Sequence, residues 1–581
     1  MQSCGCMIAM LIEAMAKQQK QNKKQPIPAK KTAEAISKNK RPAKPGVLEM
    51  LDGWLEKNDR KIFYALLFLS TALSLLLFDS KVSIGGDDSG YMERAWFFLH
   101  EGQFPLYQGP GYPVFLSLFV KLSGLNVIVL KMSSVLCQFG FVWCTYLAFR
   151  KRVPYTVLFG LLAFCSLNYF ILYYASQTYT ETFFLFIQSI CLFVFFKIMD
   201  TINRETNFID GLKQHYLKWI VFGLMFLLLS VSKSIAVVSI AAVLFYLVLN
   251  KNFKQAVYAI AAFALVRLVY ELVVISIYGQ HASGQLEMSL RKDLYKPELG
   301  HEDFTGLVNR AINNFNTYFS LHTYRILNLR DFDTLKVIPG LAFFTGIVLV
   351  VLSILSYRRN KYIFFSSIYL FAFCGAIFFG IQANNMQDRL IIIVMPLIFV
   401  LLFYGGYILS KPARIFQYVF ILFSSVMLLI TVGKSAMKAN KNLEALKKNL
   451  SGDIYYGYTP DWINYLTLSK WCADSLPKDA FVMVRKPEMS FIASRGKKFY
   501  GIYQVPSVDP DTVLQIMKQN KITHTLIANL RRDPKKNDGY IINTIQRMIV
   551  PLSQKYPQKL RLVKRMGDDE PAELYEIVYD K

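Results

Sequence analysis

Two adjacent carboxylates, Asp87 and Asp88, are the residues whose type and placement point most directly to chemistry. They follow a long apolar run and stand directly after a Gly-Gly pair, where the backbone can turn sharply. Residues 91–99 behind them carry apolar side chains at helical spacing and predict a short amphipathic helix at a membrane interface. The Gly-Pro-Gly-Tyr-Pro sequence at 109–113 ends this helix before a second apolar run. We therefore expect residues 80–124 to fold back on a membrane and to hold acids where lipid meets water.

The composition indicates a protein that crosses a membrane many times. The chain has 581 residues, of which 54% are hydrophobic and 15% aromatic, and its mean hydropathy is +0.30. About eleven apolar runs are long enough to cross a hydrocarbon core roughly 30 Å thick, which excludes a water-soluble protein. The net charge of +26 resides in tails, loops and the last domain, where Lys and Arg orient helices and bind anionic headgroups. We therefore expect membrane lipids, and no nucleic acid, as partners.

Basic segments set the expected orientation of these spans. The N-terminal arm and the basic loops at 150–152 and 358–361 favour the cytoplasmic side. The loop at 80–124 and the C-terminal part then lie outside the membrane. Within one span, Arg267 and Glu271 stand four residues apart and can pair with each other. The predicted spans cover roughly residues 61–78, 126–149, 155–173, 178–197, 219–250 (two helices that meet at a polar elbow), 253–277, 337–356, 362–381, 389–409 and 415–432.

Three parts follow from this pattern. Residues 1–60 are rich in Lys, Gln and Pro and predict a disordered basic cytoplasmic arm, in which Met15 would make a more ordinary start than Met1. Residues 61–433 form a transmembrane catalytic domain, and residues 434–581 an extracytoplasmic α/β domain. The fold class is thus mainly α, a polytopic membrane helix bundle of about eleven spans with a C-terminal α/β domain. In that domain we expect strands at 481–485, 490–494, 523–528, 560–566 and 574–579 and helices at 509–520 and 539–550.

The cysteines and histidines predict no metal centre. Of the eight cysteines, only Cys472 lies in the C-terminal domain, where it has no partner for an intradomain disulfide. No Cys or His spacing is typical of a zinc site. His281, His301 and His322 are interpreted as scattered surface residues. No cofactor is therefore predicted with a defined site, and dependence on a divalent metal stays open.

The acidic stretch resembles a known family. DDSGYMERA at 87–95, Gly102 and PGYPVFLSLFVKLSG at 110–124 are similar in order and spacing to the first extracytoplasmic loop of the C-fold (GT-C) glycosyltransferases. Within this family the stretch resembles bacterial relatives of protein O-mannosyltransferases and the aminoarabinose transferases that modify lipid A. A weaker resemblance extends to residues 178–186, 227–238 and 388–402.

This resemblance implies an activity and a location. Enzymes of the family take a sugar from a polyprenyl-phosphate carrier and transfer it, with inversion, to a lipid, glycan or protein acceptor. The chain would then be a multi-pass protein of a bacterial inner membrane, with its N-terminus in the cytoplasm and its C-terminal domain in the periplasm. Many relatives that modify lipid A carry a Lys where this chain has Gln108, which weakens the assignment of an aminosugar donor.

The resemblance also assigns roles to residues. Asp87 takes the position of the base that deprotonates the acceptor hydroxyl. Asp88 stands where relatives often have Glu; it orients the acceptor or its neighbour, or it only caps the following helix. Lys233 and Arg389 match cations near the donor phosphate. A buried ion pair for Lys233, and a side chain that merely extends to the interface for Arg389, are the structural alternatives.

Two further residues complete the predicted site. Glu181 contacts the acceptor or a metal, unless its carboxylate only favours the N-terminus of its helix. Tyr91 lines the site or anchors the interfacial helix. Two other functions remain as alternatives: a transporter or flippase of lipid-linked saccharide, and a ligase or polymerase that uses diphosphate-linked donors. The two halves of the helix pattern show no convincing repeat, which disfavours the transporter.

Overall fold

The computed structural model describes residues 46–82, 86–107, 109–202, 207–279, 289–293, 299–330, 336–382, 387–532 and 539–579. Its contacts divide the chain into two units, residues 1–50 and 51–581. The predicted disordered arm ends earlier than residue 60, because Val47–Lys57 form helix α3 and α4 begins at Asp59. An apolar side chain every three or four residues explains α3. The rest of the arm, together with Gln108 and His281, lies outside the described residues.

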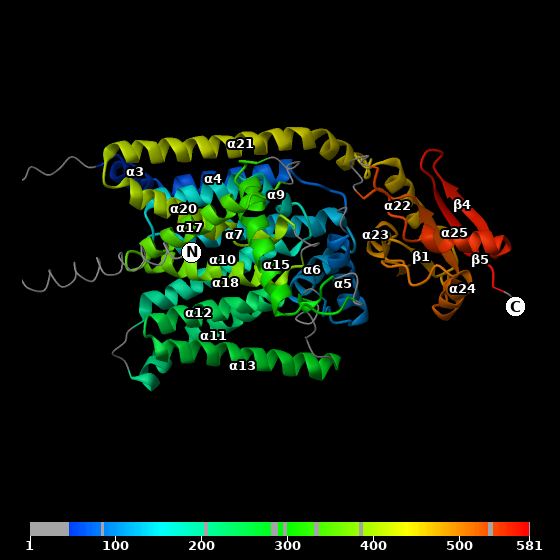
Figure 1. Ribbon diagram of the computed structural model, residues 1–581, viewed down its shortest axis with the longest axis horizontal. Coiled ribbons are helices and arrows are strands. Elements are labelled where there is room, and N and C mark those ends of the chain that lie inside the picture. The colour runs from blue at the N-terminus through cyan, green and yellow to red at the C-terminus, as the bar shows by residue number, and fades with distance from the viewer. Residues whose placement is uncertain are drawn as a thin grey trace, which may run out of the picture. The chain divides into compact units, whose positions relative to one another are not determined.

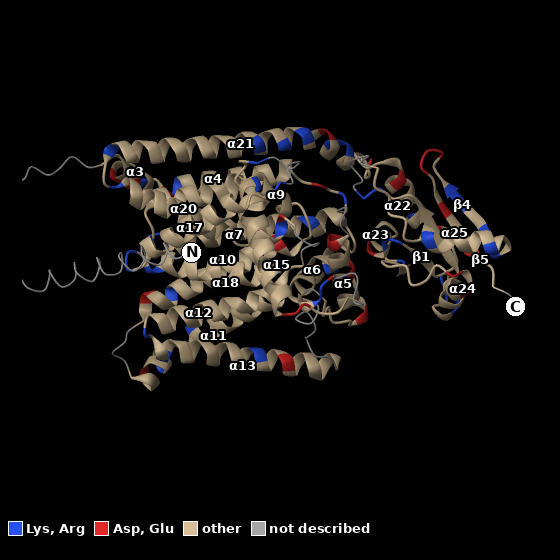
Figure 2. Cartoon of the chain, in the orientation of Figure 1, with Lys and Arg blue, Asp and Glu red and all other residues tan. Residues whose placement is uncertain are grey.

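The second unit is mainly a bundle of long helices (Figure 1). Most of the bundle is uncharged, and apart from Arg414 at its first position the charged residues of α21 lie on its C-terminal part (Figure 2). The bundle helices are α4 (Asp59–Leu76), α7 (Val127–Phe149), α8 (Tyr155–Leu167), α9 (Tyr169–Ala175), α10 (Thr180–Thr201), α11 (Phe208–Ser232), α12 (Val238–Leu249), α13 (Phe253–Tyr278), α15 (Phe304–Thr317), α17 (Pro339–Ser356), α18 (Lys361–Gly380), α20 (Met395–Ser410) and α21 (Arg414–Leu450).

Each predicted span corresponds to one or more of these helices. By length and composition alone, seven described helices can cross a membrane, or up to eight if α8 and α9, which are bent by 55°, form one span. The remaining predicted spans are shorter apolar helices, such as α12 and α20, or begin on charged residues, as α4 does at Asp59. In α13, Arg267 and Glu271 form the predicted ion pair. The chain is therefore a multi-pass membrane protein.

The predicted elbow is confirmed at Lys233. Helix α11 ends at Ser232, and Lys233 has an extended backbone (φ −148°, ψ 131°) before a short 3-10 turn, η2 (Ser234–Val237). The hydroxyls of Ser230 and Ser232 donate to backbone carbonyls one turn earlier, at 2.7 and 2.6 Å. Such back-bonding competes with the helix ladder and bends helices. The serines around Lys233 thus explain why the apolar run breaks there.

The acidic stretch forms a helical hairpin, α5 (Asp87–Glu101) and α6 (Gly111–Ser123). Between them, Gly109 has φ +92°, and a Cβ there would lie 2.7 Å from the carbonyl oxygen of Val231. Only glycine allows so close an approach in this backbone conformation. The turn therefore packs against the end of α11, directly beside Lys233.

The C-terminal region is a small α/β fold with its own apolar core. Its sheet has the order β2-β1-β3-β5-β4, with parallel pairing among the first three strands and antiparallel pairing beyond them. Helices α24 and α25 supply half of the buried core side chains, and α22 and α23 pack against strands of the same sheet. The elements are α22 (Pro460–Ser475), β1 (Val482–Val484), α23 (Pro487–Ala493), β2 (Phe499–Gly501), α24 (Pro510–Gln519), β3 (His524–Ala528), α25 (Gln546–Lys555), β4 (Leu560–Met566) and β5 (Ala572–Ile577).

Three details differ from the sequence predictions. Of residues 490–494, predicted as a strand, 490–493 belong to helix α23, because Pro487 starts a helix well and Glu488 favours its first turn. The helix predicted at 539–550 begins only at Gln546. The expected domain boundary at residue 433 falls inside α21, which continues from the bundle to Leu450.

Candidate active site

Asp87 and Arg389 form an ion pair between α5 and a bundle segment far away in the sequence. An Nη of Arg389 lies 2.6 Å from Asp87 Oδ2, and the Asp87 side chain keeps 34% of its surface exposed. Arg389 opens the short helix α19 (Arg389–Ile392), and its guanidinium lies over the Tyr179 ring, 5.2 Å from the centroid. An aromatic face stabilises such a cation. The pair is therefore anchored on the bundle side and open at the carboxylate.

Lys233 and Glu181 form a second pair beside the first. Lys233 Nζ donates to Glu181 Oε1 at 2.7 Å, and the Glu181 residue is 1% exposed in the first turn of α10. In the described part of the chain, the other Glu181 oxygen has no hydrogen-bond partner. The carboxylates of Glu181 and Asp87 both stabilise the charge on Arg389. The two pairs thus lie within electrostatic reach of each other.

Asp88 points the other way, into the protein. Asp88 and Lys131 are fully buried, and Lys131 Nζ lies 3.7 Å from Asp88 Oδ2. Lys131 also donates to Gln177 Oε1 at 2.8 Å, to the Asp79 carbonyl at 3.0 Å and to the Lys81 carbonyl. Gly86 occupies the N-cap of α5, and no side chain of the described residues forms a capping hydrogen bond there. The geometry thus gives Asp88 a structural partner on α7.

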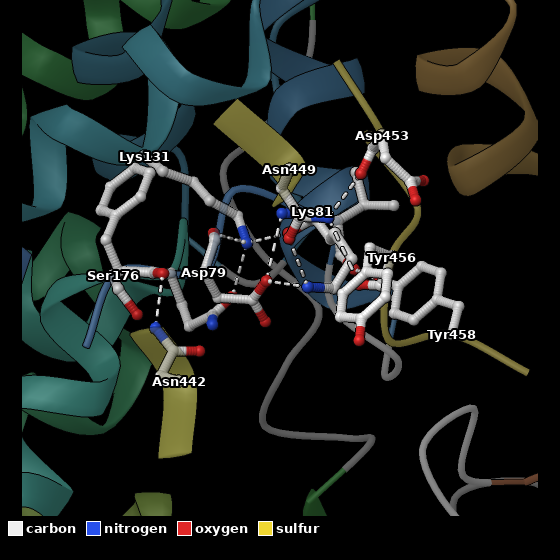
Figure 3. A network of polar contacts seen from close by, with 12 residues as sticks. Asp79, Lys81, Lys131, Ser176, Asn442, Asn449, Asp453, Tyr456 and Tyr458 are labelled. Carbon is white, nitrogen blue, oxygen red and sulfur yellow. Dashed lines mark hydrogen bonds and ion pairs between the residues drawn. The ribbon is translucent and has the colours of Figure 1, made fainter. Parts of the chain in front are cut away.

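The chain segment before Asp88 is held from a second side (Figure 3). Lys81 Nζ donates to Asn449 Oδ1 at 2.9 Å and lies 3.2 Å from Asp79 Oδ1. Asn449, near the end of α21, in turn donates to the Asp453 carbonyl at 2.7 Å. Tyr458 donates its hydroxyl to the Val82 carbonyl. Residues 79–82 are therefore held between α7 and the start of the C-terminal region.

Tyr91 is packed inside the hairpin. It is 5% exposed and meets the Tyr112 ring edge-on at 5.3 Å. The Arg94 guanidinium lies over its ring, 4.6 Å from the centroid. Burial raises the pKa of the Tyr91 phenol above its usual range. These contacts favour the anchoring interpretation of Tyr91.

His322 corrects the interpretation of the histidines as surface residues. It is 5% exposed, at the end of a π-helical turn (Tyr318–His322), and its Nδ1 contacts the carboxylate of Asp388. Arg325 lies 3.6 Å from the same carboxylate, so Asp388 fixes the backbone just before Arg389. His301 is exposed as predicted. Among the described residues, no group of three or more His, Cys, Asp or Glu is arranged to hold a metal ion.

The sequence interpretation missed three side chains of this region: Lys131, Tyr179 and Asp388. One signal was available for Lys131, because a lone Lys within an apolar helix is costly unless it has a partner. Tyr179 and Asp388 carry no such signal. Their roles depend on contacts with residues that are distant in the sequence.

This arrangement, two acid–cation pairs at the helix ends of an apolar bundle, occurs on the fold of the C-fold membrane glycosyltransferases. The oligosaccharyltransferase AglB from Archaeoglobus fulgidus, solved with an inhibitory peptide and a dolichol-phosphate, matches with a TM-score of 0.54 and 11% identity over 81% of this chain and 70% of its own. ArnT from Cupriavidus metallidurans, bound to undecaprenyl phosphate, matches with a TM-score of 0.52 and 11% identity over 90% of this chain and 98% of its own. The apo structure of ArnT matches equally well, over 91% and 98%. At this identity the likeness establishes the fold.

Neither a scan against protein-family models nor a search of curated protein sequences finds a match.

Proposed function

We propose that the protein is a glycosyltransferase that moves a hexosyl or pentosyl group from a polyprenyl-phosphate donor to the hydroxyl of a lipid, glycan or protein acceptor, with inversion. The observation that carries the proposal is the meeting of Asp87 with Arg389, next to Glu181 with Lys233, on this fold. The AglB and ArnT structures hold dolichol-phosphate and undecaprenyl phosphate, so the fold accommodates polyprenyl phosphates.

The chemistry assigns a different task to each pair. Asp87, the most exposed carboxylate of the two pairs, takes the proton of the acceptor hydroxyl as its oxygen attacks the anomeric carbon. The bond from that carbon to the phosphate oxygen breaks, and the electron pair leaves on the polyprenyl phosphate. Lys233 and Arg389 stabilise the negative charge that develops there. Glu181 acts as a positioning residue that holds the Lys233 ammonium, and Asp88 acts as one that fixes the start of α5 through Lys131.

The orientation in the membrane forms part of the proposal. The N-terminal arm lies in the cytoplasm, and the hairpin and the C-terminal region lie on the periplasmic side of a bacterial inner membrane. A cysteine introduced at the exposed Lys478 tests this orientation. In intact cells it should react with a thiol reagent that cannot cross the membrane, and protection until the cells are lysed would contradict the orientation.

The activity is tested with purified protein in nanodiscs and an extract of bacterial envelope as acceptor. The donors are polyprenyl-phosphate hexoses and pentoses and, as a separate arm, diphosphate-linked sugars. We expect release of polyprenyl phosphate, together with a glycosylated product of inverted anomeric configuration by NMR. Release from the diphosphate donors alone, or transport of the lipid-linked sugar without transfer, would refute the proposal.

The role of Asp87 is tested by Asp87→Asn. General-base catalysis contributes about 10²- to 10⁴-fold, so transfer should fall by at least roughly a hundredfold. Asp210→Asn, at an exposed carboxylate in the first turn of α11, is the matched control and should be fully active. Undiminished transfer by a folded Asp87→Asn protein would show that another group is the base.

A further inference from the structure

The C-terminal region reaches the acidic hairpin through α23, which packs against α5 (Figure 1). The Phe491 ring meets the Phe97 ring edge-on at 5.2 Å and the Trp96 ring at 6.4 Å. Just beyond α23, Lys498 donates to Glu101 Oε2 at 2.8 Å and lies over the Phe97 ring. An apolar contact framed by an ion pair thus fixes α23 on the helix that begins with Asp87.

This packing places Lys486, the residue before α23, at the start of α5. Its Nζ lies 3.8 Å from the position that a Cβ on Gly86 would occupy, and Gly86 directly precedes Asp87. Tyr465 is 1% exposed, and its hydroxyl bonds to the Lys486 backbone twice. The hydroxyl accepts from the Lys486 amide at 3.1 Å and donates to the Lys486 carbonyl oxygen at 3.2 Å. The backbone of Lys486 is therefore held in place by the C-terminal core.

Asp87 is thereby approached by cations from two parts of the chain. Arg389 comes from the bundle and contacts the carboxylate at 2.6 Å. Lys486 comes from the C-terminal region, and the negative charge of Asp87 acts on it as well. The proposed function places the donor phosphate with Lys233 and Arg389. Lys486 is thus a cation beside the base that belongs to a different element from the donor cations.

A cavity lies at the other end of α23. Its volume is about 590 Å³, within the range of roughly 300–1,000 Å³ typical of small-molecule sites. Ile492 of α23 lines one part of it and Trp96 of α5 another. The charged residues that line it are Lys81 and Arg495. Lys81 is paired with Asp79, so Arg495 is the cation that the C-terminal region contributes at this end of the contact between α5 and α23.

We propose that Lys486 binds an anionic group, a phosphate or a carboxylate, of the acceptor, next to the hydroxyl that Asp87 deprotonates. The inference rests on the proposed glycosyl transfer. It gives the C-terminal region a task in the active site, namely the selection of acidic acceptors. Opposite charge near a reacting group both raises affinity and fixes the orientation of that group.

The surroundings of Lys486 provide a signature for the test. Burial lowers the pKa of the Lys486 ammonium, and the neighbouring Arg485 lowers it further, while Glu488 and Asp87 act in the opposite direction. An Arg at this position would stay charged at any accessible pH. Binding through Lys486 should therefore weaken at a lower alkaline pH than is usual for lysine, and binding through Arg should not.

The experiment compares Lys486→Met and Lys486→Arg with Lys478→Met, a control at an exposed lysine of the same region. The acceptors are the anionic and neutral fractions of an envelope extract, separated by anion exchange. We expect wild-type transfer into the anionic fraction and at least a tenfold rise in the acceptor KM for Lys486→Met. The donor KM should not change. Lys486→Arg should retain the affinity and remove its alkaline fall.

Three results would overturn the inference. They are an unchanged acceptor KM in a folded Lys486→Met protein, transfer by the wild type into the neutral fraction alone, and a loss confined to the donor KM. The last result would assign Lys486 to the donor phosphate. A wild type that transfers no sugar from any polyprenyl-phosphate donor refutes the proposed function instead, so the two failures are distinguishable.

Discussion

Replacing Lys131 by methionine removes the buried cation that faces Asp88, and the size of the effect follows from the geometry. Two unit charges 3.7 Å apart attract each other by about 4 kcal/mol at an effective dielectric constant of about 20. The substitution also removes the ammonium that donates hydrogen bonds to the Asp79 carbonyl and to Gln177 Oε1. Breaking a buried pair at one partner typically costs about 3–5 kcal/mol, because the remaining charge stays buried. We expect a loss of this size for Lys131→Met.

A double-mutant cycle isolates the interaction with Asp88. Asp88→Asn in the Lys131→Met background removes the uncompensated carboxylate, so the double variant should be more stable than Lys131→Met alone. The assay is the apparent melting temperature of purified protein in detergent, followed by tryptophan fluorescence. Lys121→Met, at an exposed lysine in the last turn of α6, is the matched control and should melt like the wild type. If Asp88→Asn does not raise the melting temperature of Lys131→Met, the two charges are not coupled and the structural role of Asp88 is refuted.

Three further predictions concern the same region. Gly109→Ala should lower the melting temperature by several degrees, because at φ +92° a Cβ would lie 2.7 Å from the Val231 carbonyl oxygen, a strain of about 1–3 kcal/mol. The control Gly53→Ala, at a position with open space around it, should not lower the melting temperature. Equal melting temperatures of the two variants would contradict the close packing at Gly109. Burial and then Glu488 raise the pKa of Glu93 to about 8, above its ordinary 4.5. Between these two pH values the folded state holds a proton that the unfolded state has released. The free energy of unfolding should therefore fall as the pH rises through this range, by up to about 1.4 kcal/mol per pH unit. The melting temperature, measured from pH 5 to 9, should depend less on pH in Glu93→Gln than in the exposed control Glu56→Gln. The same pH dependence in both variants would argue against the raised pKa of Glu93. Arg389→Lys should reduce the proposed sugar transfer by roughly tenfold or more, because lysine lacks the planar guanidinium that lies over the Tyr179 ring. Arg358→Lys, in a loop, is the control and should be neutral. Full activity of Arg389→Lys would show that Arg389 does not act in the site.

The positions of most elements could be predicted from the sequence because their causes are local. Hydropathy marks the bundle helices, and the serines next to Lys233 mark the elbow. The amphipathic helix also follows from neighbouring residues, although it ends at Gly102, where φ is +66°, before the Gly-Pro-Gly-Tyr-Pro sequence that was expected to end it. Local signals were ambiguous for residues 490–494, since a short apolar run is compatible with a strand or a helix. The Pro487 start and the packing against α5 decide for the helix.

The candidate site could be predicted only in part. The family resemblance supplied Asp87, Glu181, Lys233 and Arg389, and the structure brings these four together. It did not supply the direction in which each carboxylate points. Asp87 faces the exposed side with Arg389, whereas its neighbour Asp88 is fully buried. Adjacent residues on a helix point about 100° apart, so which one faces the site depends on how α5 is seated.

The amino-acid sequence is enough to predict which segments are apolar enough for a membrane and where helices must break, because hydropathy and backbone preferences act over a few residues. Which charges meet depends on how the helices pack. Lys131 with Asp88, His322 with Asp388 and Lys486 with the start of α5 join segments that are remote in the chain. A buried charge needs a partner in space, and the packing of the helices selects that partner.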